Sequence, residues 1–152
     1  MKTMLFFLKT WLLVGLLDIL AAFLSFYLST GKSPLIVLKF ISSAVMGTDA
    51  YNGGAGSILL GIVLHFVVAF LFTLLFFLIY KPLRVYKYNT YLIAIVYGSF
   101  IWLVMNKLVL PMTYVKQPSF QLWEAAKAGL ILIVMIGLPL AFRLKQRYGH
   151  SQ

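Results

Sequence analysis

Four long apolar runs constrain the fold of this chain more than any other feature. They cover about residues 10–29, 56–79, 90–110 and 122–142. At 1.5 Å per residue, a helix of about 20 residues crosses the roughly 30 Å hydrocarbon core of a bilayer. Together these runs take up more than half of the chain and leave no soluble domain of appreciable size. We therefore predict one membrane domain over residues 1–152: an all-α polytopic protein with a bundle of four transmembrane helices.

The composition supports an integral membrane protein. Hydrophobic residues make up 62% of the chain and charged residues 11%, and the mean hydropathy is +0.98, which lies outside the range of soluble domains. The first run resembles a secretory signal, but Asp18 would fall inside its apolar part, so we expect a transmembrane helix instead. The absence of cysteine excludes disulfides, thiolate metal sites and thiol nucleophiles.

The basic residues flank the apolar runs. One side would hold Lys2, Lys9, Lys81, Arg84, Lys87, Arg143, Lys145 and Arg147. The other would hold Lys32, Lys39, Lys107, Lys116 and Lys127, together with Asp49 and Glu124. The positive-inside rule then places both termini in the cytoplasm. The net charge of +10 therefore indicates orientation and affinity for anionic lipid headgroups, and not nucleic-acid binding.

The link between the first two runs contains a further short helix, predicted over about residues 34–46. Ser33 suits an N-cap, Pro34 a first helical position and Gly47 a C-terminal stop. This helix is too short to span a membrane and is largely apolar. We expect it in the outer interface or folded back onto the bundle.

Small or polar residues form a regular stripe in the second run. Every fourth position is one of them, namely Gly53, Ser57, Gly61, His65, Ala69 and Thr73. This spacing places them on one face of a helix, where small residues let another helix approach closely. The other runs carry similar faces. The predicted helix-packing positions are Ser57, Gly61, Gly98 and Gly129.

Three polar residues are predicted to face the bundle interior: Asp18, His65 and Asn106. Counted from the cytoplasmic ends of the predicted spans, their depths are roughly 12, 21 and 24 Å. His65 and Asn106 would thus lie at similar levels, within reach of a direct hydrogen bond. Asp18 would lie about two turns lower, so its contact with His65 would require helix tilt, a shifted register or a bridging water.

Two interpretations of Asp18 and His65 stay open at this point. A carboxylate at the centre of a bilayer costs about 2.5–3.5 kcal/mol on insertion scales, so Asp18 needs a partner or a proton. The two side chains can act structurally, as hydrogen bonds that fix the bundle. They can also line a proton or cation path or contact a ligand.

Motifs for cofactors and metals are absent or incomplete. The segment "STGKSP" resembles the end of a phosphate-binding loop, but Phe26 occupies the position of its first glycine. His65 and His150 are the only imidazoles, so we expect no metal site and no cofactor. A haem with His65 as one axial ligand is conceivable, whereas a bis-His site is excluded because His150 belongs to the polar tail.

The run "LHFVVAFLFTLLFFLIYKPLRVYKYNTYLIAIVYGSFIWLVMNKLVLP" resembles the central part of YagU-like bacterial inner-membrane proteins. It has a histidine early in one span, a short basic turn with a proline, and a glycine-bearing span that ends in proline. The resemblance covers about a third of the chain. It implies an architecture and an address in the bacterial cytoplasmic membrane. That family has no settled activity, so the resemblance supplies no catalytic residues.

The sequence favours association over chemistry. It shows no paired carboxylates, no nucleophile with a base and no metal cluster, so we do not expect an enzyme. The leading prediction is a small membrane protein that associates through its helices, as an accessory subunit of a membrane complex or as a homo-oligomer. Its partners would be the lipid bilayer and other membrane subunits or itself. The alternative is a small transporter or channel with a proton or cation path through Asp18 and His65.

Overall fold

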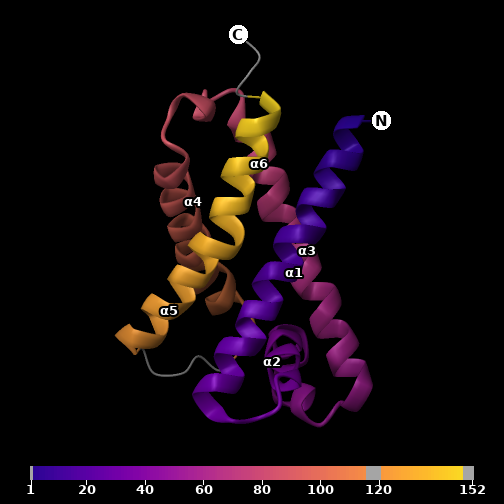
Figure 1. Cartoon of the computed structure of the whole chain (residues 1–152). Helices are drawn as coiled ribbons and strands as arrows, with labels where there is room; N and C mark the ends of the chain where they lie inside the picture. Colours follow the sequence, from indigo (N-terminus) through magenta and orange to yellow (C-terminus); the bar gives the residue numbers. More distant parts are fainter. Residues whose placement is uncertain (1, 116–120, 149–152) are drawn as a thin grey trace.

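The computed structural model describes residues 2–115 and 121–148, and the regular elements in these two ranges are all helical. Four helices are long and apolar enough to cross a membrane: Lys2–Thr30, Gly54–Tyr80, Thr90–Met112 and Leu122–Tyr148. The predicted all-α bundle of four transmembrane helices is confirmed. The first helix begins and the last helix ends at the same end of the bundle (Figure 1). We call this the terminal end and the opposite one the distal end.

The first and last helices extend beyond the apolar runs. Helix α1 (Lys2–Thr30) begins well before residue 10, and the last span continues to Tyr148 rather than ending near residue 142. Hydropathy marks only the part of a helix that lies in hydrocarbon. Lysine and arginine are good helix formers whose long side chains reach the interface, so a helix continues through them.

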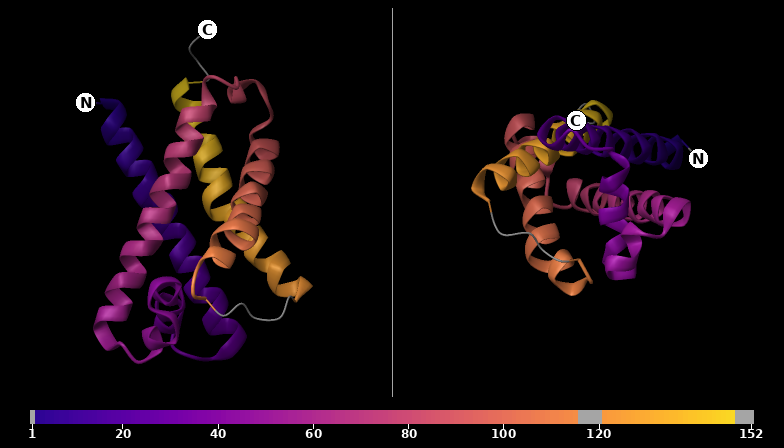
Figure 2. Two further views of the ribbon diagram at one scale, coloured as in Figure 1. Left: turned by 180° about the vertical axis from the view of Figure 1, so that it is seen from behind. Right: turned by 90° about the horizontal axis from the view of Figure 1, so that it is seen from below.

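The 3-10 turn η1 (Gly47–Tyr51) joins the short helix α2 (Leu35–Met46) to α3 (Gly54–Tyr80), and α2 folds back onto α3. Figures 1 and 2 show α2 at the distal end, between the ends of α1 and α3. A Cβ atom at Gly61 would overlap the carbonyl group of Leu38. Ser57, one turn earlier, is wholly buried and its hydroxyl contacts the sulfur of Met46 at 3.7 Å. At Ser57 and Gly61, the small-residue face of the second span is thus occupied by α2 of the same chain.

Helix α4 (Thr90–Val104) packs equally closely on the last span, which consists of α5 (Leu122–Leu132), η5 (Ile133–Gly137) and α6 (Leu138–Tyr148). A Cβ atom at Gly98 would lie 2.5 Å from the Cα atom of Ile133. A Cβ atom at Gly137 would overlap the carbonyl oxygen of Ala94. Only glycine at these two positions lets the backbones approach this closely.

Two π-helical turns precede prolines. The turn η3 (Met105–Val109) leads into the 3-10 turn η4 (Leu110–Met112), which contains Pro111, and η5 leads into Pro139. In each case the residue before the proline donates its amide to the carbonyl five residues earlier: Leu110 to Met105 and Leu138 to Ile133. Proline has no amide hydrogen, and the wider turns adapt the hydrogen-bond ladder around it.

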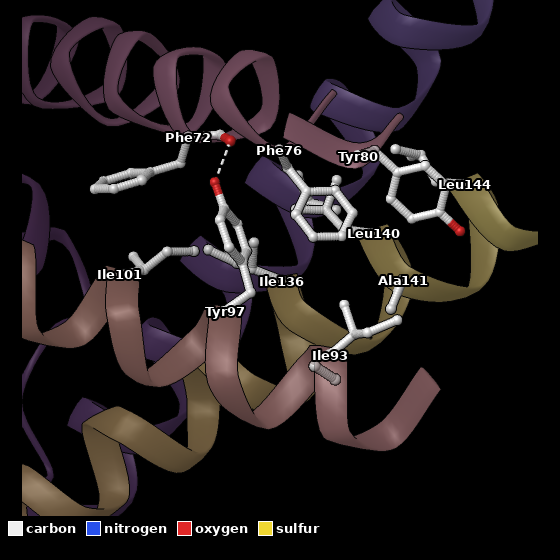
Figure 3. Packing of buried hydrophobic residues seen from close by; sticks show 12 residues of the cluster. Phe72, Phe76, Tyr80, Ile93, Tyr97, Ile101, Ile136, Leu140, Ala141 and Leu144 are labelled. Atoms are coloured by element: carbon white, nitrogen blue, oxygen red, sulfur yellow. Dashed lines mark hydrogen bonds between the residues drawn. The ribbon is translucent and has the colours of Figure 1, made fainter. Parts of the chain in front are cut away.

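The best-packed part of the bundle lies toward the terminal end and is shown in Figure 3. Aromatic rings of α3 meet Tyr97 of α4 and aliphatic side chains of α6 there. The Tyr97 hydroxyl donates to the carbonyl of Phe72 at 2.5 Å. The wholly buried members of this cluster include Tyr80, Leu140 and Leu144. Helices α3 and α4, joined through η2 (Val85–Lys87), are therefore bridged by Tyr97 and by the side chains of α6 that pack with them.

Toward the distal end, α3 and α5 diverge (Figures 1 and 2). Helix α5 buries none of its residues, and α1 buries none after Ile19. The contact between α5 and α1 at this level is a hydrogen bond from Lys127 to Ser29 at 3.1 Å. Within the described residues, the last span is thus tightly packed at the terminal end and open at the distal end, where α2 still packs closely on α3.

The contact of α2 with Gly61 predicts different effects for two glycine substitutions in α3. Gly61→Ala would force Leu38 away and should lower the free energy of unfolding by about 1–3 kcal/mol. Gly56→Ala is the matched control: nothing lies within 4 Å of its Cβ position, and alanine favours helix there. Unfolding in mild detergent would measure both. Equal stability of the two variants would contradict the packing of α2 described above.

Candidate functional site

Helices α1 and α3 cross near their centres, where Gly15 faces Phe66. A Cβ atom at Gly15 would lie 2.8 Å from the Cε1 atom of Phe66 and 3.5 Å from the Cβ atom of Ala69. Two hydrogen bonds join the helices at this point. Trp11 Nε1 donates to the Phe66 carbonyl at 2.9 Å, and His65 Nε2 lies 2.9 Å from the Gly15 carbonyl. Each helix thus contributes one side chain and one carbonyl to the crossing.

The carbonyl partner determines which nitrogen of His65 carries a hydrogen. A carbonyl oxygen only accepts, so Nε2 must be the donor. The other ring nitrogen, Nδ1, has no hydrogen-bond partner in the described part of the chain. The ring edge also packs against the ring of Phe66, with 5.3 Å between centroids. His65 is therefore fixed through one nitrogen and keeps the other for a proton or a ligand.

Asp18 lies on the same face of α1 as Gly15, one turn further along. His65 reaches the carbonyl of Gly15, three residues before Asp18, so it lies within about one helical turn of Asp18. Within residues 2–115 and 121–148, however, Asp18 makes no hydrogen bond and no ion pair shorter than 4.0 Å. A half-buried carboxyl in the middle of a membrane-spanning helix is thus beside a histidine but not bonded to it.

The depth predicted for Asp18 was too small, because the observed α1 begins at Lys2 rather than near residue 10. At about 1.5 Å per residue, Asp18 lies about 24 Å from the terminal end of α1. His65 lies about 22 Å from the terminal end of α3 by the same measure. The two residues therefore share one level, and the separation of two turns disappears.

Asn106 does not join this pair. Its amide donates to the carbonyl of Trp102 at 2.8 Å, four residues earlier in the same helix. The direct hydrogen bond between His65 and Asn106 that similar depths would permit is not formed, because each side chain uses a carbonyl instead. Asn106 lies in the π-helical turn η3, where an extra polar group supports the widened backbone.

The fourth predicted packing position, Gly129, lies in an open groove between α4 and α5. The groove is mainly apolar and has a volume of about 260 Å³. Its lining residues are Ser99, Trp102, Leu122, Ala125, Ala126 and Gly129. A Cβ atom at Gly129 would lie 3.8 Å from the ring of Trp102, an ordinary contact distance. Gly129 thus faces an unfilled space, unlike Gly61 and Gly98.

The structure offers little for a metal or an organic cofactor. The volume of the groove lies just below the range of about 300–1,000 Å³ that is usual for ligand pockets. Among the described residues, no group of three histidine, aspartate or glutamate side chains could hold a metal ion. His150, the second imidazole of the chain, lies outside the described residues.

Sequence reasoning missed Trp11 as a partner in the helix crossing. Trp11 and Gly15 are four residues apart and so share a face of α1, which was the available signal. The expected packing stripe of α3 did not say which helix each of its members meets. In the structure, Gly61 contacts α2 and Ala69 contacts α1.

Comparisons with protein families, with curated proteins and with solved structures found no match to this chain. The resemblance to YagU-like proteins therefore stays a prediction. The function has to be argued from the geometry of the described residues.

Proposed function

We propose that this multi-pass membrane protein acts by association, as an accessory subunit whose α4–α5 groove receives an apolar helix of a partner. The observation that carries this proposal is the exposure of α5, which buries none of its residues although it lies in a membrane-spanning helix. Lipid tails are as apolar as leucine, so helices associate in membranes where small residues permit close contact. The groove offers Ala125, Ala126 and Gly129 for such a contact.

The lining of the groove suits a helix with bulky apolar side chains. Its small residues Ala125, Ala126 and Gly129 leave space beside the bulky Trp102 and Leu122. A bulky side chain of a partner helix would fill that space. The packing faces at Ser57, Gly61 and Gly98 are already used within the chain, which leaves the groove as the open one among these predicted positions.

Filling the groove should abolish association. Ala126→Leu places a bulky side chain in the groove and should reduce partner recovery about tenfold or more, as expected for an overpacked contact. Ala128→Leu makes the same change at an exposed position of α5 outside the groove and should have no effect. Native mass spectrometry of particles extracted in mild detergent would measure both.

Three outcomes would count against the accessory-subunit proposal. A lone monomer in the wild-type extract would contradict the proposal. A particle containing only copies of this chain would show self-association instead of binding to a different protein. A partner lost equally from both leucine variants would place the contact elsewhere.

A second candidate function is the movement of protons or small cations, and the arrangement of Asp18 and His65 favours it. A carboxyl without a hydrogen bond costs free energy in hydrocarbon. Beside it, His65 keeps one ring nitrogen without a partner in the described residues. A proton exchanged between these two groups at the centre of α1 and α3 would be one step of a path across the membrane.

Proton flux into liposomes tests the second candidate. Asp18→Asn should abolish the flux, because an amide neither binds nor releases a proton near neutral pH. Glu124→Gln is the control, since Glu124 is an exposed carboxylate at the distal end that pairs with Lys127 at 2.7 Å. If the wild-type protein shows no flux, or if Asp18→Asn retains it, the transport function is wrong.

We further propose that the protein lies in a bacterial inner membrane with both termini in the cytoplasm. The excess of basic residues at the terminal end supports this orientation. The chain has no cysteine, so single cysteines would report cleanly on each side. A maleimide that cannot cross membranes should label Asp49→Cys in intact spheroplasts, and Lys87→Cys only after permeabilisation. The reverse labelling pattern would place both termini on the outer side of the membrane.

A further inference from the structure

Two arginines of α6 are held in place at the terminal end by residues of α1, without any carboxylate. Arg143 Nε donates to the hydroxyl of Thr10 at 2.9 Å, and Arg147 Nη2 donates to the hydroxyl of Thr3 at 3.1 Å. Thr10 is wholly buried and donates in turn to the carbonyl of Phe6 at 2.8 Å. Arg143 is therefore anchored to a fixed group.

The ring of Phe6 supports both guanidinium groups. Their central carbons lie 5.2 Å (Arg143) and 4.5 Å (Arg147) from its centroid. These distances allow cation–π attraction, which orients a guanidinium over a ring. Arg143 and Arg147 are also four residues apart and so occupy one face of α6. The two positive groups are thus arranged side by side before any ligand arrives.

Most of the hydrogen-bonding capacity of these arginines remains free. A guanidinium has five N–H donors, and each arginine uses one in the described structure. The three acidic residues of the chain are elsewhere: Asp18 at the centre of α1, and Asp49 and Glu124 toward the distal end. Two guanidinium groups with free donors, and with no acidic side chain nearby among the described residues, form a site for an anion.

The depth of the site matches lipid headgroups. At about 1.5 Å per residue, Arg143 and Arg147 lie about 31 and 37 Å along the last span from Leu122. A hydrocarbon core of about 30 Å ends at this level, and the headgroup region begins.

We propose that Arg143 and Arg147 form a binding site for the phosphodiester of an anionic phospholipid. The free N–H donors of the two guanidinium groups would bind the phosphate oxygens, with Phe6 behind them. This site is distinct from the α4–α5 groove and independent of the function assigned to that groove. It differs from the general attraction of a basic membrane protein to an anionic surface because it depends on two particular side chains.

Lipid titration followed by native mass spectrometry tests the site, with the full chain in mild detergent. Phosphatidylglycerol should bind at least about tenfold more tightly than phosphatidylcholine with the same acyl chains, given the strength of charge-assisted hydrogen bonds. The double variant Arg143→Gln/Arg147→Gln should lose most of this preference. The control Arg84→Gln/Lys87→Gln removes the same charge from exposed residues at the same end and should change binding less than about twofold.

A second double variant separates geometry from charge and keeps the test valid if the glutamine variant does not fold. Arg143→Lys/Arg147→Lys retains both charges but loses the planar fork of donors, so it should weaken binding of phosphatidylglycerol. Equal loss in the glutamine variant and its control, or full binding in the lysine variant, would overturn the site in favour of diffuse attraction. Displacement of the lipid by equimolar inorganic phosphate would show a free-phosphate site instead.

Discussion

Close backbone contact at glycine is the interaction on which the rest of this structure depends. In a bilayer, burying apolar side chains between helices gains little, because lipid already surrounds them with apolar groups. Helices stay together where their backbones approach, and three glycines provide this: Gly61 between α3 and α2, and Gly98 and Gly137 between α4 and the last span. Gly15 makes room for the ring of Phe66 where α1 crosses α3. The contacts in turn bring polar side chains within reach of carbonyl groups on the neighbouring helix. His65 reaches Gly15, Trp11 reaches Phe66, and Tyr97 reaches Phe72.

The carbonyls in these bonds belong to helices, where each already accepts an amide of its own ladder. A carbonyl oxygen has two lone pairs, so a side chain can donate to it without breaking the helix. This arrangement satisfies an indole, an imidazole and a phenol in a medium that supplies no water. Asp18 cannot use it, since an ionised carboxyl only accepts. Asp18 therefore has no hydrogen-bond partner among the described residues, which is also true of the buried hydroxyls of Thr73 and Tyr80. Asp18 is the acidic group of the three, and an unpaired carboxyl at this depth is the most costly to keep.

The sequence predicted the parts of this structure that depend on periodicity and composition. The four spans and the packing roles of small residues follow from patterns that repeat along one helix. It did not predict which helices meet, because a stripe of small residues specifies a close contact and not its partner. The depth of Asp18 was wrong because the predicted span started at Thr10, after Lys9, whereas the helix continues through Lys9 and the apolar residues 4–8 to Lys2. The hydrogen bond of Asn106 to its own helix was not predicted, because the pattern shows that the side chain is polar but not which group it bonds.

The two ends of the bundle differ in a way that connects the proposed functions. At the terminal end, the rings of α3 and α4 and the aliphatic residues of α6 form a closed core, and α1 fixes the arginines of α6. At the distal end, α5 buries nothing and a groove with a small-residue lining stays open. The last span is packed on α4 and α1 at the terminal end and separates from α3 at the distal end. It can therefore present a binding surface at the distal end without losing its fold. This asymmetry supports the two proposals together: the terminal end would bind lipid phosphates, and the distal end would bind a partner helix.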